Sequence, residues 1–366
     1  LLLSIGLSPP LAIAGALAYG LSSYFFIIIE AGHNTKAHAM AYMAPVLAGI
    51  IMAYRGKLLA GAAITALFLA LHLRANHLQI TYYLFIMVLI YGLFELVNAM
   101  KEKKISEFLK TGLVLVFAAL IAVGSNMEKI WATYEYGKYS TRSQSELTTN
   151  GDGANKTSGL NKDYATSWSY GKMETFNLMI PNFMGGASNS ELSLDSKVFQ
   201  TLKKNRVPNA KNIIKGMPTY WGGQPFTSGP VYIGAVSCFL FVLGLFIVKG
   251  RLKWWLLTCT LLSIALAWGN NMMWFTDIFL DYVPGYNKFR TVSMILVISE
   301  LTIPLLGFIA LKQILYENID KEIIIDFSSE SIFNPFNKNL SCYTGDKFVT
   351  EDLDYQGIFD MEAYAL

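Results

Sequence analysis

Three short segments of this sequence bring together cationic side chains and hydrogen-bond donors. Residues 30–38 read Glu-Ala-Gly-His-Asn-Thr-Lys-Ala-His, residues 74–79 read Arg-Ala-Asn-His-Leu-Gln, and residues 284–290 read Pro-Gly-Tyr-Asn-Lys-Phe-Arg. Arg presents a fork of donors to phosphate oxygens, and Lys presents a point charge. Cations with Asn and His donors, at one edge of a helical bundle, suit the phosphate of a lipid. For any single cation, a side chain that merely extends to lipid head groups is the simpler interpretation.

The four histidines form two pairs, His33 with His38 and His72 with His77. Their i,i+5 spacing is poor for two ligands on one helix face. A divalent cation shared by His33 and His77 is an alternative to plain hydrogen-bonding histidines, so the sequence names no certain cofactor. The cysteines lie far apart and predict neither a disulfide framework nor a zinc site: Cys238, Cys259 and Cys342.

Aromatic residues and glycines are dense between Trp168 and Phe226. Aromatic platforms between glycine turns suit the faces of sugars. Aromatic side chains at a membrane surface also form an ordinary interfacial belt. The composition of this stretch leaves both interpretations open.

The elements that must position these residues are apolar. Of 366 residues, 53% are apolar and 15% are charged, whereas an ordinary soluble domain is about 25% charged. This composition excludes disorder, and a net charge of +3 does not indicate nucleic acid. A membrane helix needs about 20 apolar residues. We expect an all-α polytopic membrane protein with eight spans: 11–29, 38–53, 58–73, 80–99, 108–124, 231–248, 254–268 and 292–311.

The connections between these runs alternate in charge. One set is basic, with Arg55, the lysines of 101–110 and the cations of 249–253, so the positive-inside rule predicts that this set is cytoplasmic. The segment of about 105 residues that follows residue 124 then lies outside. We expect a five-helix bundle at 1–124, an outer loop domain at 125–230, a three-helix bundle at 231–312 and an acidic cytoplasmic tail at 313–366.

Three polar residues interrupt the apolar runs: Glu95, Asn98 and Glu300. Glu95 and Asn98 are one turn apart, near the predicted cytoplasmic end. Glu300 is near the middle of the last run, four residues before Pro304. An ionisable group inside the membrane is a functional hypothesis by default. A buried structural acid is the alternative that we favour for Glu300.

Several motifs, which follow one another along the chain, resemble those of the YfhO-like bacterial membrane proteins. Their residues look most like those of the Bacteroidetes branch. They are Glu30–Lys36, Asn76–Gln79 with Tyr82 and Tyr83, Trp168–Gly171 with Glu174, Ile180–Asn182 with Gly185 and Gly186, Tyr220–Phe226 with Gly229–Tyr232, and Asn287–Arg290. The resemblance covers roughly residues 5–312. That family is similar to the GT-C glycosyltransferases, which take a sugar from a polyprenyl-phosphate donor at the outer membrane face. It implies a multi-pass protein of the bacterial inner membrane with a periplasmic loop.

The resemblance also implies roles. The donor phosphate and head group would be held by His33, Asn34, Lys36, Arg74, Asn76, His77, Lys288 and Arg290. Sugar or acceptor would face Trp168, Tyr170, Tyr220, Trp221 and Gln224. The partners would be a polyprenyl-phosphate-linked sugar, a cell-envelope glycan or lipid acceptor, and membrane lipids, with no nucleic acid.

In that superfamily the catalytic carboxylate usually follows the first span and acts as the base that activates the acceptor hydroxyl. The chain begins Leu1-Leu2-Leu3 without Met, so we expect a fragment that lacks this carboxylate and is inactive alone. Glu30 and Glu174 are the outer acids that remain as catalytic candidates.

Two other classes of function share these features. A transporter or flippase of lipid-linked sugars would use the same cations, but it predicts broken helices. The sequence shows no paired Gly/Pro interruptions, only Pro45 and Pro304. A membrane scaffold without catalysis would leave the outer polar motifs unexplained.

Overall fold

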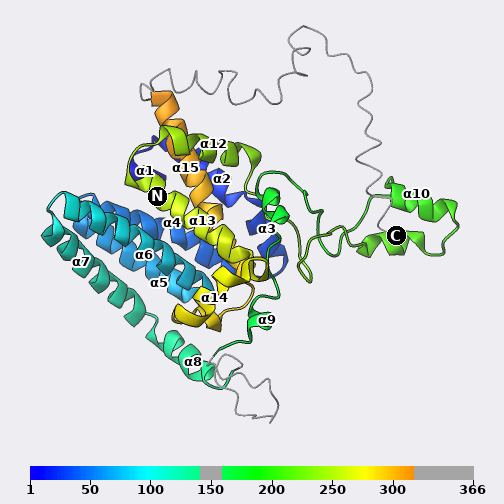
Figure 1. Ribbon diagram of the computed structural model, residues 1–366, viewed down its shortest axis with the longest axis horizontal. Coiled ribbons are helices and arrows are strands. Elements are labelled where there is room, and N and C mark those ends of the chain that lie inside the picture. The colour runs from blue at the N-terminus through cyan, green and yellow to red at the C-terminus, as the bar shows by residue number, and fades with distance from the viewer. Residues whose placement is uncertain (141–158, 317–366) are drawn as a thin grey trace, which may run out of the picture. The chain divides into compact units, whose positions relative to one another are not determined.

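The computed structural model describes residues 1–140 and 159–316 (Figure 1). Within these ranges the secondary structure is helical, with two isolated β-bridges, Gly185 to Tyr220 and Ser190 to Met217, and no strands. Most of the predicted acidic tail and Cys342 lie outside the described residues. The described part therefore confirms an all-helical fold.

The first half of the chain forms a run of helices that turn back on one another. They are α1 (Leu2–Ile5), α2 (Pro9–Gly20), α3 (Ser23–Glu30), α4 (Asn34–Tyr54), α5 (Leu58–Arg74), α6 (Leu78–Lys101), α7 (Ile105–Gly124) and α8 (Met127–Gly137).

The second half begins with short elements and returns to long helices. They are α9 (Lys162–Ala165), η1 (Met173–Leu178), α10 (Lys197–Lys204), α11 (Ala210–Ile213), η2 (Ile214–Gly216), α12 (Ala235–Ile247), α13 (Arg251–Ala267), η3 (Gly269–Met272), α14 (Met273–Tyr282), η4 (Tyr286–Lys288), η5 (Val292–Leu296) and α15 (Val297–Tyr316).

Four helices of the described residues are long and apolar enough to cross a membrane: α4, α6, α7 and the continuous η5–α15. The number rises to six if each of two bent helix pairs is one span. The chain is therefore a multi-pass membrane protein by the length and composition of its helices. Each of the eight predicted runs is mostly helical, but α5 and α12 are shorter than a typical span. Eight spans, and the domain boundaries near 124, 230 and 312, stay predictions.

Two helix pairs of the described residues are bent sharply. The pair α2 and α3 bends by 44°, and α13 bends by 110° into η3 and α14. The first bend divides the predicted run 11–29, whereas the second follows the end of the predicted run 254–268. Neither bend contains a Gly/Pro pair. Ser22 starts α3 with extended backbone angles, and Gly269 ends α13 with φ of +48°. A Cβ atom at Gly269 would lie 2.1 Å from Ser169 Oγ, so only glycine fits there.

Helices α4 and α5 approach closely because glycines face each other. A Cβ atom built at Gly49 would lie 2.7 Å from the Gly61 carbonyl oxygen, and one at Gly61 would lie 2.5 Å from Ala53 N. Small residues that let backbones approach are typical of helix contacts inside membranes. This contact joins the two helices whose neighbouring ends carry residues 33–36 and 72–77.

Helix α15 is the core of the bundle, since every residue from Val297 to Ala310 is buried. It contacts α2, α12 and α13. Hydroxyl pairs join it to α13, with Thr260 Oγ1 and Thr302 Oγ1 2.7 Å apart. Helix α7 differs, because its apolar residues Leu113, Phe117 and Leu120 are exposed. We expect that face of α7 to contact lipid.

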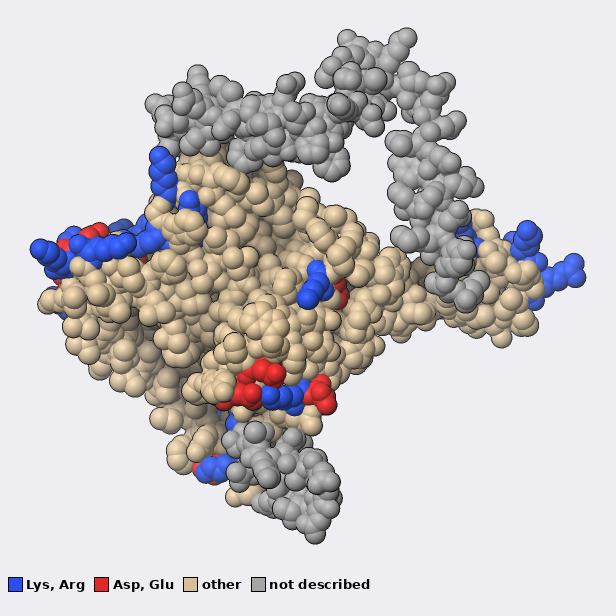
Figure 2. All heavy atoms as spheres, in the orientation of Figure 1, with Lys and Arg blue, Asp and Glu red and all other residues tan. Residues whose placement is uncertain are grey.

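Lys and Arg side chains gather where α6 turns into α7 (Figure 2), at residues 101–104. We call the end of the bundle formed by this turn, Arg55 and the start of α13 the basic end. Buried Glu95 of α6 accepts a hydrogen bond from Arg251 Nε at 2.9 Å there, and Asn98 is bonded to exposed Glu102. The positive-inside rule predicts that the basic end is cytoplasmic.

Candidate functional site

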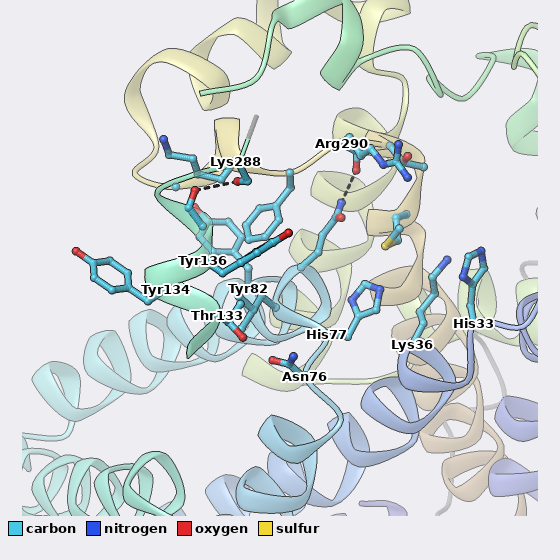
Figure 3. Close-up of a pocket in the computed structure, with 18 of the residues that line it drawn as sticks. His33, Lys36, Asn76, His77, Tyr82, Thr133, Tyr134, Tyr136, Lys288 and Arg290 are labelled. Carbon is cyan, nitrogen blue, oxygen red and sulfur yellow. Dashed lines mark hydrogen bonds between the residues drawn. The ribbon is translucent and has the colours of Figure 1, made fainter. Parts of the chain in front are cut away.

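The three polar segments meet around one cavity of about 990 Å³. His33 and Lys36 line it from the start of α4, His77 and Asn76 from the start of α6, and Arg290 from the segment before η5 (Figure 3). Lys288 of η4 and residues of α8 complete the wall. We call this space the cavity. Its described lining includes Lys and Arg side chains but no Asp or Glu.

The ends of two long helices face the cavity. His33 is the residue before α4, and His77 is the residue before α6, whose first turn it caps by accepting from Ile80 N at 3.4 Å. Asn76 makes the turn before α6 with φ of +54°, a conformation that Asn tolerates better than most residues. The unpaired N–H groups and dipole of a helix N-terminus favour an anion. Two such ends therefore face the same space.

Gln79 joins residues 284–290 to α6 by a hydrogen bond. Its Nε2 donates to the Arg290 carbonyl oxygen at 2.7 Å and to the Tyr83 hydroxyl at 2.8 Å. Tyr82 donates to the Pro284 carbonyl at 2.8 Å. The Arg290 guanidinium donates to the Tyr164 hydroxyl at 2.7 Å. These bonds fix the backbone from which Arg290 reaches the cavity.

Lys36 is a buried cation without an anion. Its relative exposure is 7%, and its ammonium lies 5.5 Å from the centre of the Tyr24 ring. It makes no ion pair or hydrogen bond with the residues that the structure describes. An uncompensated buried charge is expensive in a protein, so an anion bound beside Lys36 would be stabilised.

The histidines of the cavity are neutral at neutral pH. Burial first, and then the charge of Lys36, lowers the pKa of His77 from 6.5 to about 4. Burial and the charges of Lys36 and Arg290 also lower the pKa of His33. The same positive field that disfavours imidazolium would stabilise a bound anion.

Glu174 lies beside a smaller cavity of about 140 Å³, which His33, Lys36 and Trp168 also line. Its buried carboxylate accepts from Gly171 N at 3.0 Å, the Tyr220 hydroxyl at 3.0 Å and Gln224 Nε2 at 2.8 Å. Burial raises the pKa of Tyr220 to about 12, with a further increase from Glu174, so the phenol stays a donor. Glu174 therefore organises the wall that Tyr220 and Gln224 build.

Other predicted residues lie apart from the two cavities. Glu30 and Asn34 are exposed and line neither, and Trp221 is 66% exposed. Arg74 is exposed and also lines neither; its carbonyl accepts from Lys129. By contrast, Trp168 lines both cavities and Tyr170 lines the smaller one.

A metal shared by His33 and His77 gains no support. Both side chains line the cavity. Among the described residues, however, no group of three or more His, Cys, Asp or Glu side chains is placed to hold a metal ion.

Sequence reasoning missed part of the wall. Tyr134 and Tyr136 of α8 line the cavity, and so do Thr291 and Met294. The run of aromatic residues at 131–139, directly after an apolar run, was the signal that could have identified α8. Thr291 was harder to find, because its left-handed backbone, with φ of +61°, is unusual for a β-branched residue.

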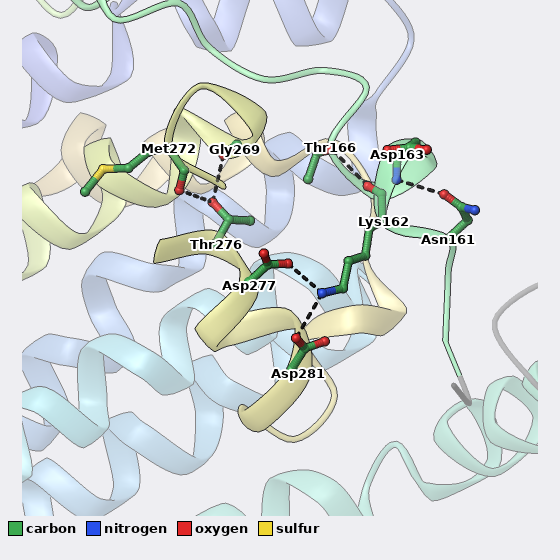
Figure 4. A network of polar contacts seen from close by, with 9 residues as sticks. All are labelled: Asn161, Lys162, Asp163, Thr166, Gly269, Met272, Thr276, Asp277 and Asp281. Carbon is green, nitrogen blue, oxygen red and sulfur yellow. Dashed lines mark hydrogen bonds and ion pairs between the residues drawn. The ribbon is translucent and has the colours of Figure 1, made fainter. Parts of the chain in front are cut away.

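A cluster of ion pairs, which we call the clamp, joins α9 to α14 (Figure 4). Lys162 Nζ lies 2.6 Å from Asp277 Oδ1 and 2.9 Å from Asp281 Oδ2 of α14. Nearby backbone bonds join Leu160 N to the Asn287 carbonyl and Thr291 N to the Ala165 carbonyl. The carboxylates raise the pKa of Lys162, which therefore stays charged. The clamp positions the segment from which Tyr164 contacts Arg290.

Comparisons with known proteins add no family to this geometry. No family model, no curated protein and no solved structure matches the chain.

Proposed function

We propose that the cavity binds the phosphate of a lipid-linked sugar and that the protein transfers this sugar at the outer membrane face. The observation that carries the proposal is Lys36, a buried cation that lacks an anion and faces a cavity with His77 and Arg290. A phosphodiester supplies the missing charge, and Arg290 supplies a fork of donors for its oxygens.

The rest of the lining suits the remainder of such a ligand. Leu78, Phe289 and Met294 offer apolar surface to a lipid chain, and Trp168 with Phe226 offers aromatic faces to a sugar. The volume of about 990 Å³ is at the upper end of small-molecule sites. The ligand class is therefore amphipathic and anionic.

These residues would assist the leaving group of a glycosyl transfer. The acceptor hydroxyl attacks the anomeric carbon and releases its proton to water, the bond from that carbon to the phosphate oxygen breaks, and the polyprenyl phosphate leaves with its electron pair. Lys36 and Arg290 stabilise the negative charge that grows on this phosphate. Glu174 is assigned a positioning role, because its three donors occupy the carboxylate.

The proposed acceptor is a cell-envelope glycan or lipid, and the proposed location is the bacterial inner membrane with residues 125–230 outside. The alternation of basic and polar connections supports this orientation.

Movement of lipid-linked sugars across the membrane is a second candidate function. The two broken helix pairs favour it, since discontinuous helices are typical of transporter binding sites.

The test is binding and transfer of a radiolabelled polyprenyl-phosphate sugar by the purified chain in nanodiscs. We expect Lys36→Ala and Arg290→Ala each to weaken binding about tenfold or more, because each removes a charge-assisted contact. Lys57→Ala is the matched control, an exposed lysine at the basic end. Unchanged binding in both Lys36→Ala and Arg290→Ala would disprove the phosphate site.

The fate of the label separates the two functions. Label that moves onto an acceptor in membrane extract supports transfer. Label that changes leaflet in vesicles without changing its chemical form supports transport and contradicts transfer.

A further inference from the structure

Glu300 is the one fully buried carboxyl group of the described residues that has no bonding partner. Its relative exposure is 0%, and neither carboxyl oxygen makes a hydrogen bond. The other buried carboxylates are satisfied, Glu95 by Arg251 and Glu174 by three donors. Glu300 does not line the cavity, and the proposed sugar transfer does not use it.

The turn of α15 shows which way Glu300 points. Ser299 and Thr302 are three residues apart and meet the hydroxyls of Ser263 and Thr260 on α13. A helical residue advances by about 100°, so Glu300 lies on a different face from these hydroxyls. The polar side chain next to its carboxyl is Ser22, at the break between α2 and α3. The Ser22 hydroxyl is also buried, and the geometry falls short of a hydrogen bond.

Among the residues that the structure describes, no cation balances a charge on Glu300. The titratable groups within reach of its charge are Tyr19 of α2, Tyr24 of α3, Cys238 of α12 and Tyr170 of the outer segment. Helix α13 contributes hydroxyls that are already paired. An isolated carboxylate in such surroundings is far more costly than the neutral acid, so the carboxyl group carries a proton.

Groups that interact electrostatically with Glu300 line two separate spaces of the described structure. Tyr24 and Tyr170 line the smaller cavity together with Lys36. Tyr19 lines a separate groove of about 730 Å³ with Leu301 and Pro304.

We propose that Glu300 is a proton-binding site inside the bundle, loaded from water in the smaller cavity, with the Ser22 hydroxyl at the α2–α3 break as the polar group next to it. Hydronium gives one proton to the carboxylate and becomes water, and the charge of the site changes from −1 to 0. The three oxygens of Glu300 and Ser22 are fewer than the six to eight that Ca²⁺ takes, whereas they suffice for one proton. The broken helix supplies the place where the backbone adjusts to that change in charge.

Infrared difference spectroscopy of the full chain in nanodiscs, between alkaline and acid buffer, tests this site. A protonated carboxyl group gives a carbonyl band that disappears when it ionises. We expect native protein to show such a band, Glu300→Gln to lose it, and Glu95→Gln to keep it. Glu95→Gln is the matched control because Glu95 is also buried but is paired with Arg251.

Ser22→Ala keeps the test decisive if Glu300→Gln fails to fold. This change leaves the carboxyl group in place, so the band should persist at a shifted frequency. Identical spectra for native protein, Glu300→Gln and Ser22→Ala would overturn the proposal. So would loss of the band when sodium chloride replaces choline chloride at constant pH, because the site would then bind sodium.

Discussion

The cavity and the basic end both bury a charged side chain, but they treat it in opposite ways. At the basic end, Glu95 has 5% relative exposure and accepts from Arg251 at 2.9 Å. At the cavity, Lys36 has 7% exposure and forms no ion pair with a residue that the structure describes. Both groups sit near the end of a long helix that is apolar enough to span a membrane. Burial alone therefore does not separate them; the partner does.

The difference separates a structural charge from a functional one. A buried ion pair is complete in the folded chain, and removing one member costs stability. A buried charge without a partner already costs stability, so the chain gains from a ligand that supplies the opposite charge. The comparison predicts that removing a cation lowers the free energy of unfolding at the basic end and raises it at the cavity.

The largest effect is expected for Arg251→Met, which leaves Glu95 buried and unpaired. We expect the free energy of unfolding to fall by about 2 kcal/mol, which is less than for a fully buried pair because Arg251 is 38% exposed. The measurement is the midpoint of unfolding by SDS in mixed micelles.

Two controls accompany Arg251→Met. Lys249→Met changes an exposed cation nearby and should move stability by less than about 0.5 kcal/mol. The double variant with Glu95→Gln should recover part of the loss, since no charge is then stranded. An unchanged midpoint for Arg251→Met would show that the pair at the basic end contributes nothing.

Lys36→Met is expected to have the opposite sign. It removes a buried cation without a partner and keeps the length of the side chain, so the ligand-free protein should gain about 1.5 kcal/mol of unfolding free energy. The same variant should lose binding of the polyprenyl-phosphate sugar. Lys57→Met, at an exposed lysine, should change neither quantity. A less stable Lys36→Met would mean that Lys36 has a structural role.

The pH dependence of ligand affinity tests whether His77 lies beside the bound anion. Its pKa in the folded protein is about 4, below the ordinary value of 6.5. A bound phosphodiester favours the imidazolium, so the complex takes up a proton. Affinity should rise by about fivefold as pH falls from 7 towards 5, and level off below the ligand-free pKa. Binding measured at several pH values should show this rise in native protein and lose it in His77→Asn. A flat profile in the native protein would place His77 away from the anion.

The stability of the ligand-free protein should change with pH in the opposite direction to the affinity, and fall as the pH falls. Between pH 6.5 and about 4 the unfolded chain takes up a proton on His77 before the folded chain does. Its stability therefore falls as the pH falls through this window.

The sequence predicted the gathering of the outer segments because charge is scarce in this chain. Alternating connections sorted residues 30–38, 74–79 and 284–290 onto one side, and the structure places His33, His77 and Arg290 around one cavity. Their assigned roles stay predictions. Side-chain direction could not be predicted, since it depends on where a helix ends. Arg74 is the last residue of α5 and points away, whereas His77, three residues later, faces the cavity.

The broken helices show another limit of the sequence. Apart from Ser22 and Ser23 the stretch 11–29 is apolar, and two serines do not by themselves divide an apolar run. The break follows from tertiary contacts that fix the start of α3. Ser23 Oγ donates to the Pro230 carbonyl at 2.8 Å, and Tyr232 N donates to Ser23 Oγ at 2.8 Å. These partners lie more than 200 residues away in the sequence, beyond what local patterns report.

The left-handed backbone at Thr291 has a consequence for how this protein can change over time. A β-branched residue at φ of +61° costs on the order of 1–3 kcal/mol, and Thr291 lines both cavities. Selection for heat resistance alone would favour Gly or Asn at this position. Thr291 therefore lowers thermal stability at a position that lines both cavities, in keeping with the usual trade between stability and activity.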